Sequence, residues 1–234
     1  TAVLEAAGPF DALWNLGDMV GYGASPNQVI DLIRPIAQLT VRGNHDRVCC
    51  GLTSSVGFNP VARAAANWTN RELTPENIAW LRTLPQGPLH PEFPGITCAH
   101  GSPLNEDQYI LSMRDAWAPL QQMTTAITFF GHTHLQGGFS QKDHDWQEIK
   151  PQYNTRNDAE SLIMPIPPGT RHLINPGSVG QPRDYDWRAA FAIYDSNSVE
   201  IIYHRVPYDL TAAQGRILMA GLPERLAARL REGR

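Results

Sequence analysis

The chain has 234 residues, of which 42% are hydrophobic and 18% are charged, and this is enough apolar material to bury one sizeable core. Its formal net charge of −4 gives no indication of a nucleic-acid-binding or membrane-binding face. No apolar run approaches the roughly 20 residues that span a bilayer, no signal peptide is visible, and the three cysteines are too few for a disulfide framework, so we expect a cytoplasmic protein with reduced thiols.

The N-terminal residues alternate between helix and strand. Residues 1–7 have the composition of a helix but contain no helix start signal, so they read as the interior of a helix. Residues 11–16 and 38–42 are predicted to be short buried strands. Between them, residues 26–36 carry apolar side chains at helical spacing, and Pro35 predicts that this helix ends close to residue 34.

Two helices and two strands are predicted next. Helices are expected at residues 59–73 and 74–84, the second with Thr74 as its N-cap and a proline at its first position. Residues 96–99 and 126–130 are short apolar runs of strand type. Strands and helices that alternate in this way indicate a layered α/β domain.

The chain changes character after residue 135. Residues 136–170 are polar, contain several glycines and prolines and lack convincing periodicity, so we expect a loop or hairpin excursion there. Strands resume at residues 172–175, 189–194 and 199–206. The tail, residues 211–231, is predicted to form two short helices separated by a Gly-Leu-Pro turn.

Four mostly apolar stretches break off abruptly into a glycine-flanked Asp, Asn or His. The four segments are Gly17-Asp18, Gly43-Asn44-His45-Asp46, Ala99-His100-Gly101 and Gly131-His132-Thr133-His134. An open α/β sheet places the ends of its strands side by side, and ligands bind in the crevice beyond them. Each segment alone is weak evidence, because Gly-Asp and Gly-Asn are ordinary turn dipeptides, but the set predicts one polar site.

These side chains include the donors that a divalent metal centre requires. Phosphate esters are attacked efficiently when two metal ions roughly 3.5–4 Å apart share a hydroxide and clamp the phosphoryl oxygens. Asp18 offers a carboxylate able to bridge two ions, and Asn44 offers a neutral amide oxygen. The imidazoles of His100, His132 and His134 suit Zn, Mn, Fe or Ni, whereas an all-oxygen set would favour Mg or Ca. The last two histidines would share a face on a strand or reach two different metals from a loop.

His45 and Asp46 are predicted to be catalytic rather than metal-binding. His45 directly follows Asn44 and cannot easily ligate the same ion, so we expect it to donate a proton to the leaving oxygen. Asp46 is the candidate for orienting the His45 ring. The alternative for His45 is a merely structural histidine.

Three further side chains are candidates for substrate contact: Tyr22, Arg47 and Arg183. A guanidinium near the metals can bind a phosphate oxygen. The alternative is a surface arginine paired with Asp184 or Asp186, and the sequence does not separate the two.

These motifs resemble the calcineurin-like metallophosphoesterase family, whose signature runs D-x-H, G-D-x-x, G-N-H-[DE], a single His after a strand, and G-H-x-H. Four of the five blocks are present within residues 17–134. Residues 17–23 and 175–184 look like the small bacterial and archaeal branch of phosphodiesterase-like members. The resemblance implies an α/β fold of two facing mixed β-sheets flanked by helices, a four-layer α/β/β/α sandwich, in one domain over residues 1–234.

The resemblance also implies a role for each predicted ligand. Asp18 would bridge both ions. Asn44, His100 and His132 would hold one ion, and His134 would help to hold the other. The histidine after Asn44 would protonate the leaving group or stabilise the transition state.

One block of the family signature, D-x-H, is absent from the sequence. In the family it supplies an Asp and a His to the second ion and ends the first strand, just before the helix that residues 1–7 continue. We therefore expect that the given sequence is truncated at its start, so that the first strand and part of the following helix are missing from it. If the absence is real, the second ion keeps only Asp18 and His134, and a single-metal or inactive protein follows.

We expect a metal-dependent hydrolase of phosphate esters that acts through two divalent ions (Mn, Fe, Zn or Ni) and a bridging hydroxide. Phosphodiesters are the first choice of substrate, by resemblance. The expected partner is a small phosphoester, with no nucleic acid and no membrane, and the residues set no oligomeric state. The alternative is a catalytically silent binding or regulatory protein that retains the fold.

Overall fold

The computed structural model describes residues 1–234 and divides them into α-helices, one short 3-10 helix and strands. The helices are α1 (Ala2–Ala7), α2 (Pro26–Ile33), α3 (Asn44–Cys49), η1 (Ser55–Gly57), α4 (Pro60–Glu72), α5 (Pro75–Thr83), α6 (Met113–Gln122), α7 (Leu210–Met219) and α8 (Glu224–Glu232). The strands are β1 (Trp14–Asn15), β2 (Leu39–Thr40), β3 (Ile96–Ala99), β4 (Ile127–Phe130), β5 (Gly137–Lys142), β6 (Asp145–Ile149), β7 (Glu160–Pro165), β8 (Arg171–Asn175), β9 (Ala189–Asp195) and β10 (Glu200–Val206).

The strands form two larger sheets and one pair. The five-stranded sheet has the order β3-β4-β8-β5-β6, in which β3, β4 and β8 run parallel and β5 and β6 are antiparallel. The three-stranded sheet, β7-β10-β9, is antiparallel, and β1 and β2 form a separate parallel pair. Every residue of β3 and β4 is buried, because parallel strands of this kind are covered on both faces.

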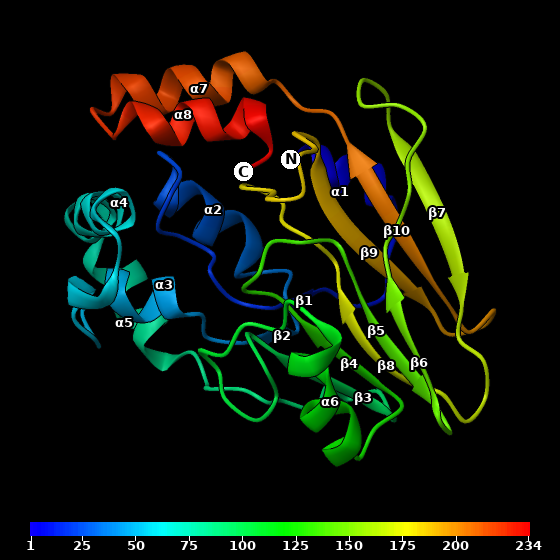
Figure 1. Ribbon diagram of the computed structural model, residues 1–234. Helices are drawn as coiled ribbons and strands as arrows, with labels where there is room; N and C mark the ends of the chain where they lie inside the picture. The colour runs from blue at the N-terminus through cyan, green and yellow to red at the C-terminus, as the bar shows by residue number, and fades with distance from the viewer.

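The two larger sheets face each other, and each has a helix on its outer side (Figure 1). α1 contacts β9 and β10, and α6 contacts β5, β6 and β8. The core between the sheets joins Ile127 and Ile174 of the five-stranded sheet to Ile201 and Tyr203 of β10. The expected arrangement of helix, sheet, sheet and helix is therefore confirmed.

The remaining helices gather at one side of the sandwich (Figure 1). Helices α2 to α5 enclose an apolar cluster that includes Ile30 and Leu81. α7 and α8 pack against each other, and Leu226 and Leu230 of α8 share a cluster with Ala65 of α4. No helix of the structure is both long enough and apolar enough to cross a membrane.

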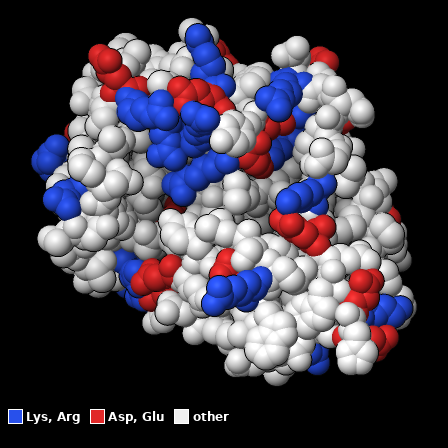
Figure 2. All heavy atoms as spheres, viewed as in Figure 1, with Lys and Arg blue, Asp and Glu red and all other residues white.

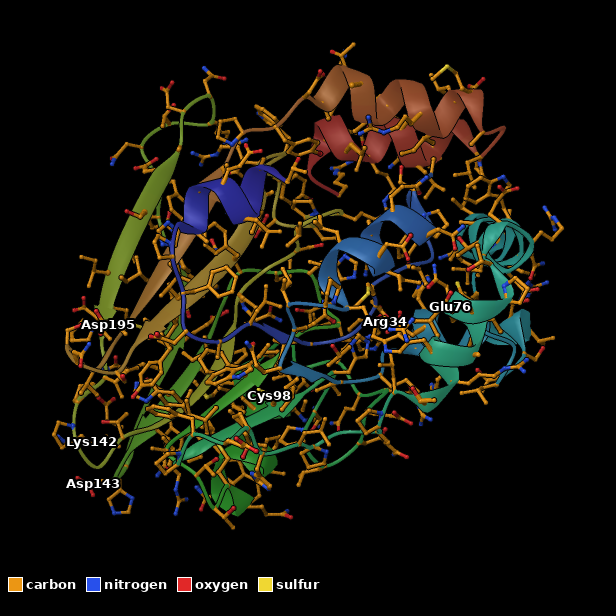
Figure 3. The ribbon with its side chains drawn as sticks, turned by 180° about the vertical axis from the view of Figure 1, so that it is seen from behind. Arg34, Glu76, Cys98, Lys142, Asp143 and Asp195 are labelled. Carbon is orange, nitrogen blue, oxygen red and sulfur yellow. The ribbon has the colours of Figure 1, made fainter.

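The three cysteines and one surface ion pair can be located in the fold. All three cysteines are buried and unpaired, and Figure 3 shows Cys98 on β3 inside the sandwich. Arg34, at the end of α2, points toward Glu76 of α5, with Nη1 and Oε1 3.2 Å apart (Figure 3). The structure joins none of the three cysteines to another.

Most predicted elements are present with small shifts in their ends. The helices predicted at 59–73 and 74–84 are α4 and α5, and Thr74 Oγ1 accepts a hydrogen bond of 3.2 Å from the Asn77 amide. α2 ends one residue before Arg34, and the tail divides into α7 and α8 as predicted. β1 and β2 have only two residues each, so the strands predicted there are shorter than expected.

Residues 136–170 differ most from the prediction, because they supply three strands. β5 and β6 form a hairpin, with Lys142 and Asp143 at its turn (Figure 3), and β7 is an edge strand of the other sheet. The expected hairpin is correct, whereas the alternative of an extended loop is wrong. β6 and β7 both lie at sheet edges and leave at least half of their residues exposed, so neither shows the run of buried apolar residues that marks a central strand.

His172 makes the stability of the sandwich depend on pH. It lies on β8, where its side chain is 3% exposed, and its Nδ1 is buried without a hydrogen-bond partner. Burial lowers the pKa of the His172 imidazole from 6.5 to about 4. Because the unfolded chain binds a proton below pH 6.5 and the folded protein does not until about pH 4, stability is lost as the pH falls through this window.

We expect His172→Leu to remove part of this pH dependence. The wild-type protein should lose about 2 kcal/mol more than the variant between pH 7 and pH 4.5, measured as the free energy of unfolding in urea. Leucine is apolar and suits a buried position. Because His172 Nδ1 has no hydrogen-bond partner, the substitution breaks no hydrogen bond at this atom, and the variant should remain folded at pH 7. His144→Leu is the control, because His144 is exposed in the β5–β6 turn. An equal pH dependence in wild type and His172→Leu would contradict the prediction.

Candidate metal centre

Four predicted ligands follow the carboxyl ends of four strands. Asp18 comes after β1, Asn44 after β2, His100 after β3 and His132 after β4. β1 is parallel to β2, and β3 is parallel to β4, so these ends lie at one edge of each pair. A hydrogen bond of 2.8 Å between His100 Nδ1 and the Leu16 carbonyl joins the two pairs.

The structure brings these four side chains together. One donor atom each from Asp18, His100 and His132 lie within 4.8 Å of one another. His100 Nε2 is 3.4 Å from Asp18 Oδ2 and 3.2 Å from Asn44 Oδ1. Because His100 Nδ1 donates to Leu16, its Nε2 is the nitrogen that faces the other donors. One carboxylate, one amide oxygen and two imidazoles fit a divalent transition metal.

The backbone at this site is held in an uncommon conformation. Asp18, His132 and His134 have φ angles of 53°, 65° and 61°. Side chains other than glycine rarely adopt this left-handed region, which costs of order 1 kcal/mol or more per residue and persists where the surroundings impose it. Three of the five predicted ligands therefore share a strained conformation, which is typical of a functional site.

Asp18 and His100 form a buried ion pair. Burial alone would raise the pKa of Asp18, but the charges of His100 and His45 hold it well below its ordinary range. Burial would lower the pKa of His100, but the Asp18 carboxylate raises it to about 9. The carboxylate that the resemblance makes a bridging ligand is therefore ionised.

The two histidines that follow β4 lie in a loop and have different partners. His132 Nε2 is 3.2 Å from the Asp107 carbonyl, and its ring stacks on Tyr109 with centroids 4.1 Å apart. His134 Nδ1 is 2.7 Å from the Gln181 carbonyl. His132 belongs to the group with Asp18 and His100, whereas His134 lies outside it. The sequence allowed these two histidines to lie either on a strand or in a loop, and in the structure they lie in a loop.

Burial keeps both of these imidazoles neutral near pH 7. Burial and the charge of His100 lower the pKa of His132 to about 4. Burial and the charge of Arg183 lower the pKa of His134 to about 3. A neutral imidazole has a free nitrogen lone pair, which is the form that binds a metal.

Asp46 does not contact the His45 ring as expected. Its carboxylate accepts hydrogen bonds from the backbone amides of Asp18 (2.8 Å), Met19 (2.9 Å) and Gly43 (2.9 Å). Burial and the Asp18 charge raise its pKa to about 6. Asp46 therefore ties the Asp18 loop to the start of α3. It is a positioning residue, and the prediction that it orients His45 is wrong.

His45 packs against two aromatic rings next to Asp18. Its ring centroid is 4.2 Å from that of Tyr22 and 4.5 Å from that of Phe58. The backbone amide of His45 donates to Asp18 Oδ1 at 2.8 Å, and its Nδ1 is buried without a hydrogen-bond partner. Gly21 has a φ of 119° and leaves room for this ring, because a Cβ there would lie 2.4 Å from His45 Nδ1.

Arg47 is held by carboxylates rather than left for a substrate. It forms an ion pair with Glu106, and its Nη2 is 2.6 Å from Asp107 Oδ1. These contacts anchor the loop whose Asp107 carbonyl meets His132. Arg47 therefore supports a metal ligand from behind, and its predicted substrate contact is not what the structure shows.

Arg183 has no carboxylate partner. Its Nη2 donates to Tyr22 Oη at 3.1 Å and to Gln181 Oε1 at 3.2 Å, and its Nε is buried without a partner. The alternative, a pair with Asp184 or Asp186, is wrong, because Asp184 pairs with Arg205 and Asp186 with Arg188. Tyr22 and Arg183 thus form one polar unit beside His45 and His134.

Three residues that support the site are not among the predicted ones. Asn175 Nδ2 donates to the Gly131 carbonyl and to Thr133 Oγ1, which fixes the loop between the two histidines. Tyr109 stacks on the first histidine of that loop, and Gln181 bonds the second. Asn175 and Gln181 both lie in residues 175–184, the segment that resembles the small bacterial and archaeal branch, whereas no local motif marks Tyr109.

Comparison with known proteins identifies relatives along the whole chain. A model of the calcineurin-like phosphoesterase superfamily domain matches residues 1–198, which include every predicted site residue. An uncharacterized protein from Methanocaldococcus jannaschii is 33% identical over 225 residues, covering 94% of this chain and 85% of that protein. The relationship therefore includes the sandwich and all of the loops described above.

Two solved structures are similar to this one. The crystal structure of a metallophosphoesterase from Sphaerobacter thermophilus superposes with a TM-score of 0.82 at 37% identity, covering 100% of this chain and 92% of that chain. A hypothetical protein from Pyrococcus horikoshii superposes with a TM-score of 0.75 at 20% identity, covering 98% of this chain and 88% of that chain. The second likeness indicates a shared fold.

Proposed function

This chain belongs to the calcineurin-like phosphoesterase superfamily, and we propose that it hydrolyses phosphodiesters at a centre of two divalent metal ions. The family and the fold support a metal-dependent phosphoesterase. The observation that carries the proposal is the convergence of Asp18, Asn44, His100 and His132 from four separate loops onto one point. The choice of diesters rests on the resemblance of residues 17–23 and 175–184 to phosphodiesterase-like members.

Each metal ion would have its own set of protein ligands. Asn44, His100 and His132 would hold the first ion, Asp18 would contribute to both, and His134 would contribute to the second. Mixed oxygen and nitrogen donors favour Mn, Fe, Zn or Ni. Bound divalent ions lower the pKa of water and neutralise charge that develops on phosphoryl oxygens.

Arg183 would bind a phosphoryl oxygen of the substrate. It is half-buried, carries no carboxylate partner and lies close enough to His45 and His134 to lower the pKa of both imidazoles. Tyr22 Oη and Gln181 Oε1 hold one end of the guanidinium in place. A planar guanidinium matches two oxygens of a phosphate group, so this residue would orient the ester.

His45 would assist departure of the leaving alcohol. Burial lowers the pKa of its imidazole, so it is neutral near pH 7 and carries a proton on one nitrogen. With Nδ1 enclosed against Gly21, Nε2 is the nitrogen left for the substrate. A hydrogen bond from Nε2 to the leaving oxygen would stabilise the charge that develops there.

Turnover of two chromogenic esters tests the proposal. We expect the protein loaded with Mn²⁺ or Ni²⁺ to hydrolyse bis-p-nitrophenyl phosphate faster than p-nitrophenyl phosphate. Arg183→Gln should lower kcat/KM for the diester about 10- to 100-fold, because a hydrogen bond to a charged group is lost. Arg71→Gln, at the exposed end of α4, is the matched control. Metal bound at two ions per chain without turnover of either ester would favour a silent binding protein instead.

A further inference from the structure

The arginines that are not fully exposed differ in their partners. Arg42 pairs with Glu106, and Arg171 Nη1 donates to the Leu120 and Gln121 carbonyls. Arg47, Arg188 and Arg205 each lie within salt-bridge distance of at least one carboxylate. Arg183 and Arg229 are also partly buried, and neither has a carboxylate within 4.0 Å. Positive charge that the protein leaves uncompensated in a partly desolvated place is a feature that an anionic ligand would explain.

Arg229 comes from α8, far along the chain from the metal ligands. On either side of it, Leu226 and Leu230 pack in the cluster that Tyr22 joins. Its Nε donates to the Arg234 carbonyl at 2.6 Å, which leaves the two Nη groups without a hydrogen-bond partner. Figure 2 shows Lys and Arg side chains over α8 and on the surface below it, with Asp and Glu side chains among them.

Arg229 lies beside the loop that carries Arg183. The Tyr185 amide, two residues after Arg183, donates to the Gly233 carbonyl at 2.8 Å, and the next carbonyl, of Arg234, accepts from Arg229 Nε. Burial, followed by the charge of Arg183, lowers the pKa of Arg229. Glu232 lies on the same helix as Arg229, but it pairs with Arg225, 3.1 Å away. Tyr22 lies beside both guanidiniums, and its ring is 4.2 Å from that of His45. The pair of cations therefore adjoins the metal centre on its Tyr22 side.

We propose that Arg183 and Arg229, with the Tyr22 hydroxyl, form a subsite for a second phosphate group that the substrate carries beyond the ester that is hydrolysed. The proposal rests on the proposed function and names its substrate class as phosphodiesters with an additional phosphate. Arg183 reaches both the reacting phosphate and the second one, whereas Arg229 contacts only the second. Arg229 lies outside residues 1–198, so the family match does not account for it.

Two substrates that differ by one phosphate test this subsite. Thymidine 5′-(p-nitrophenyl phosphate) and its 3′-phosphorylated form release the same nitrophenol. We expect wild-type protein loaded with Mn²⁺ to prefer the 3′-phosphorylated ester about tenfold in kcat/KM, and Arg229→Gln to reduce this preference to about twofold or less. Arg231→Gln is the control, because Arg231 is exposed on the same helix and bonds only Gln214.

A binding measurement keeps this inference separate from the proposed function. By isothermal titration of the Mn²⁺-loaded protein, pyrophosphate should bind about tenfold more weakly to Arg229→Gln than to wild type, whereas the affinity for inorganic phosphate should change less than twofold. If neither ester is hydrolysed, the proposed function fails, and the pyrophosphate result still decides the subsite. Equal turnover of both esters by wild type, or equal pyrophosphate affinity in wild type and Arg229→Gln, would overturn the subsite alone.

Discussion

His132→Ala is expected to abolish both metal binding and hydrolysis. The substitution removes one of the two imidazoles in the group whose donor atoms lie within 4.8 Å of one another. We expect metal content, measured by mass spectrometry of the purified protein, to fall to less than about a tenth of the wild-type value, and kcat/KM for bis-p-nitrophenyl phosphate to fall at least about a thousandfold. The second figure follows because metal ions supply several kcal/mol of transition-state stabilisation.

His45→Ala is the comparison that gives this result its meaning. The bond from residue 45 to Asp18 Oδ1 comes from the backbone amide, so alanine retains it. We therefore expect the variant to keep its metal and its Asp18 geometry but to turn over the diester about 10²- to 10⁴-fold more slowly, as for loss of a general acid. Equal metal loss in the two variants would refute the division into a metal ligand and a proton donor.

The convergence of the metal ligands can be predicted from the sequence, because each ligand follows its own strand. Parallel strands bring their carboxyl ends together, so short motifs at residues 18, 44, 100 and 132 were sufficient to predict that these side chains meet. The contacts of Arg47 cannot be predicted in this way. Its carboxylate partners lie 59 and 60 residues further along the chain, in a loop without a motif. Only the tertiary fold brings that loop beside α3.

Two elements show where local patterns are insufficient. α6 begins with a capping box, in which Ser112 Oγ accepts from the Asp115 amide and the Asp115 carboxylate accepts from Ser112, but the proline at position 119 argues against a helix. Packing of Ala116 and Leu120 under the five-stranded sheet overrides that signal. β7 reads Glu-Ser-Leu-Ile-Met-Pro, in which polar and apolar residues do not alternate, and its partner β10 follows 35 residues later, so no local pattern marks this strand.

Gly43→Ala is expected to separate the loops that carry Asp18 and Asn44. Gly43 has φ −93° and ψ 169°, a conformation that alanine adopts freely, so the effect of the substitution is steric. A Cβ there would lie 2.3 Å from the Asp18 amide and closer still to Asp18 Oδ1. Because both neighbours belong to a buried and hydrogen-bonded loop, they cannot move without breaking the bonds that Asp46 makes to it.

We expect Gly43→Ala to lower the free energy of unfolding by about 1–3 kcal/mol, measured in urea, and to weaken Mn²⁺ binding at least about tenfold in isothermal titration. Gly23→Ala is the matched control, because it lies five residues after Asp18 and a Cβ there meets nothing within 4 Å. The comparison separates backbone contact from side-chain chemistry, since neither variant removes a ligand. If Gly43→Ala bound Mn²⁺ as tightly as Gly23→Ala, the close approach of the two loops would not be what places Asp18 beside Asn44 and His100.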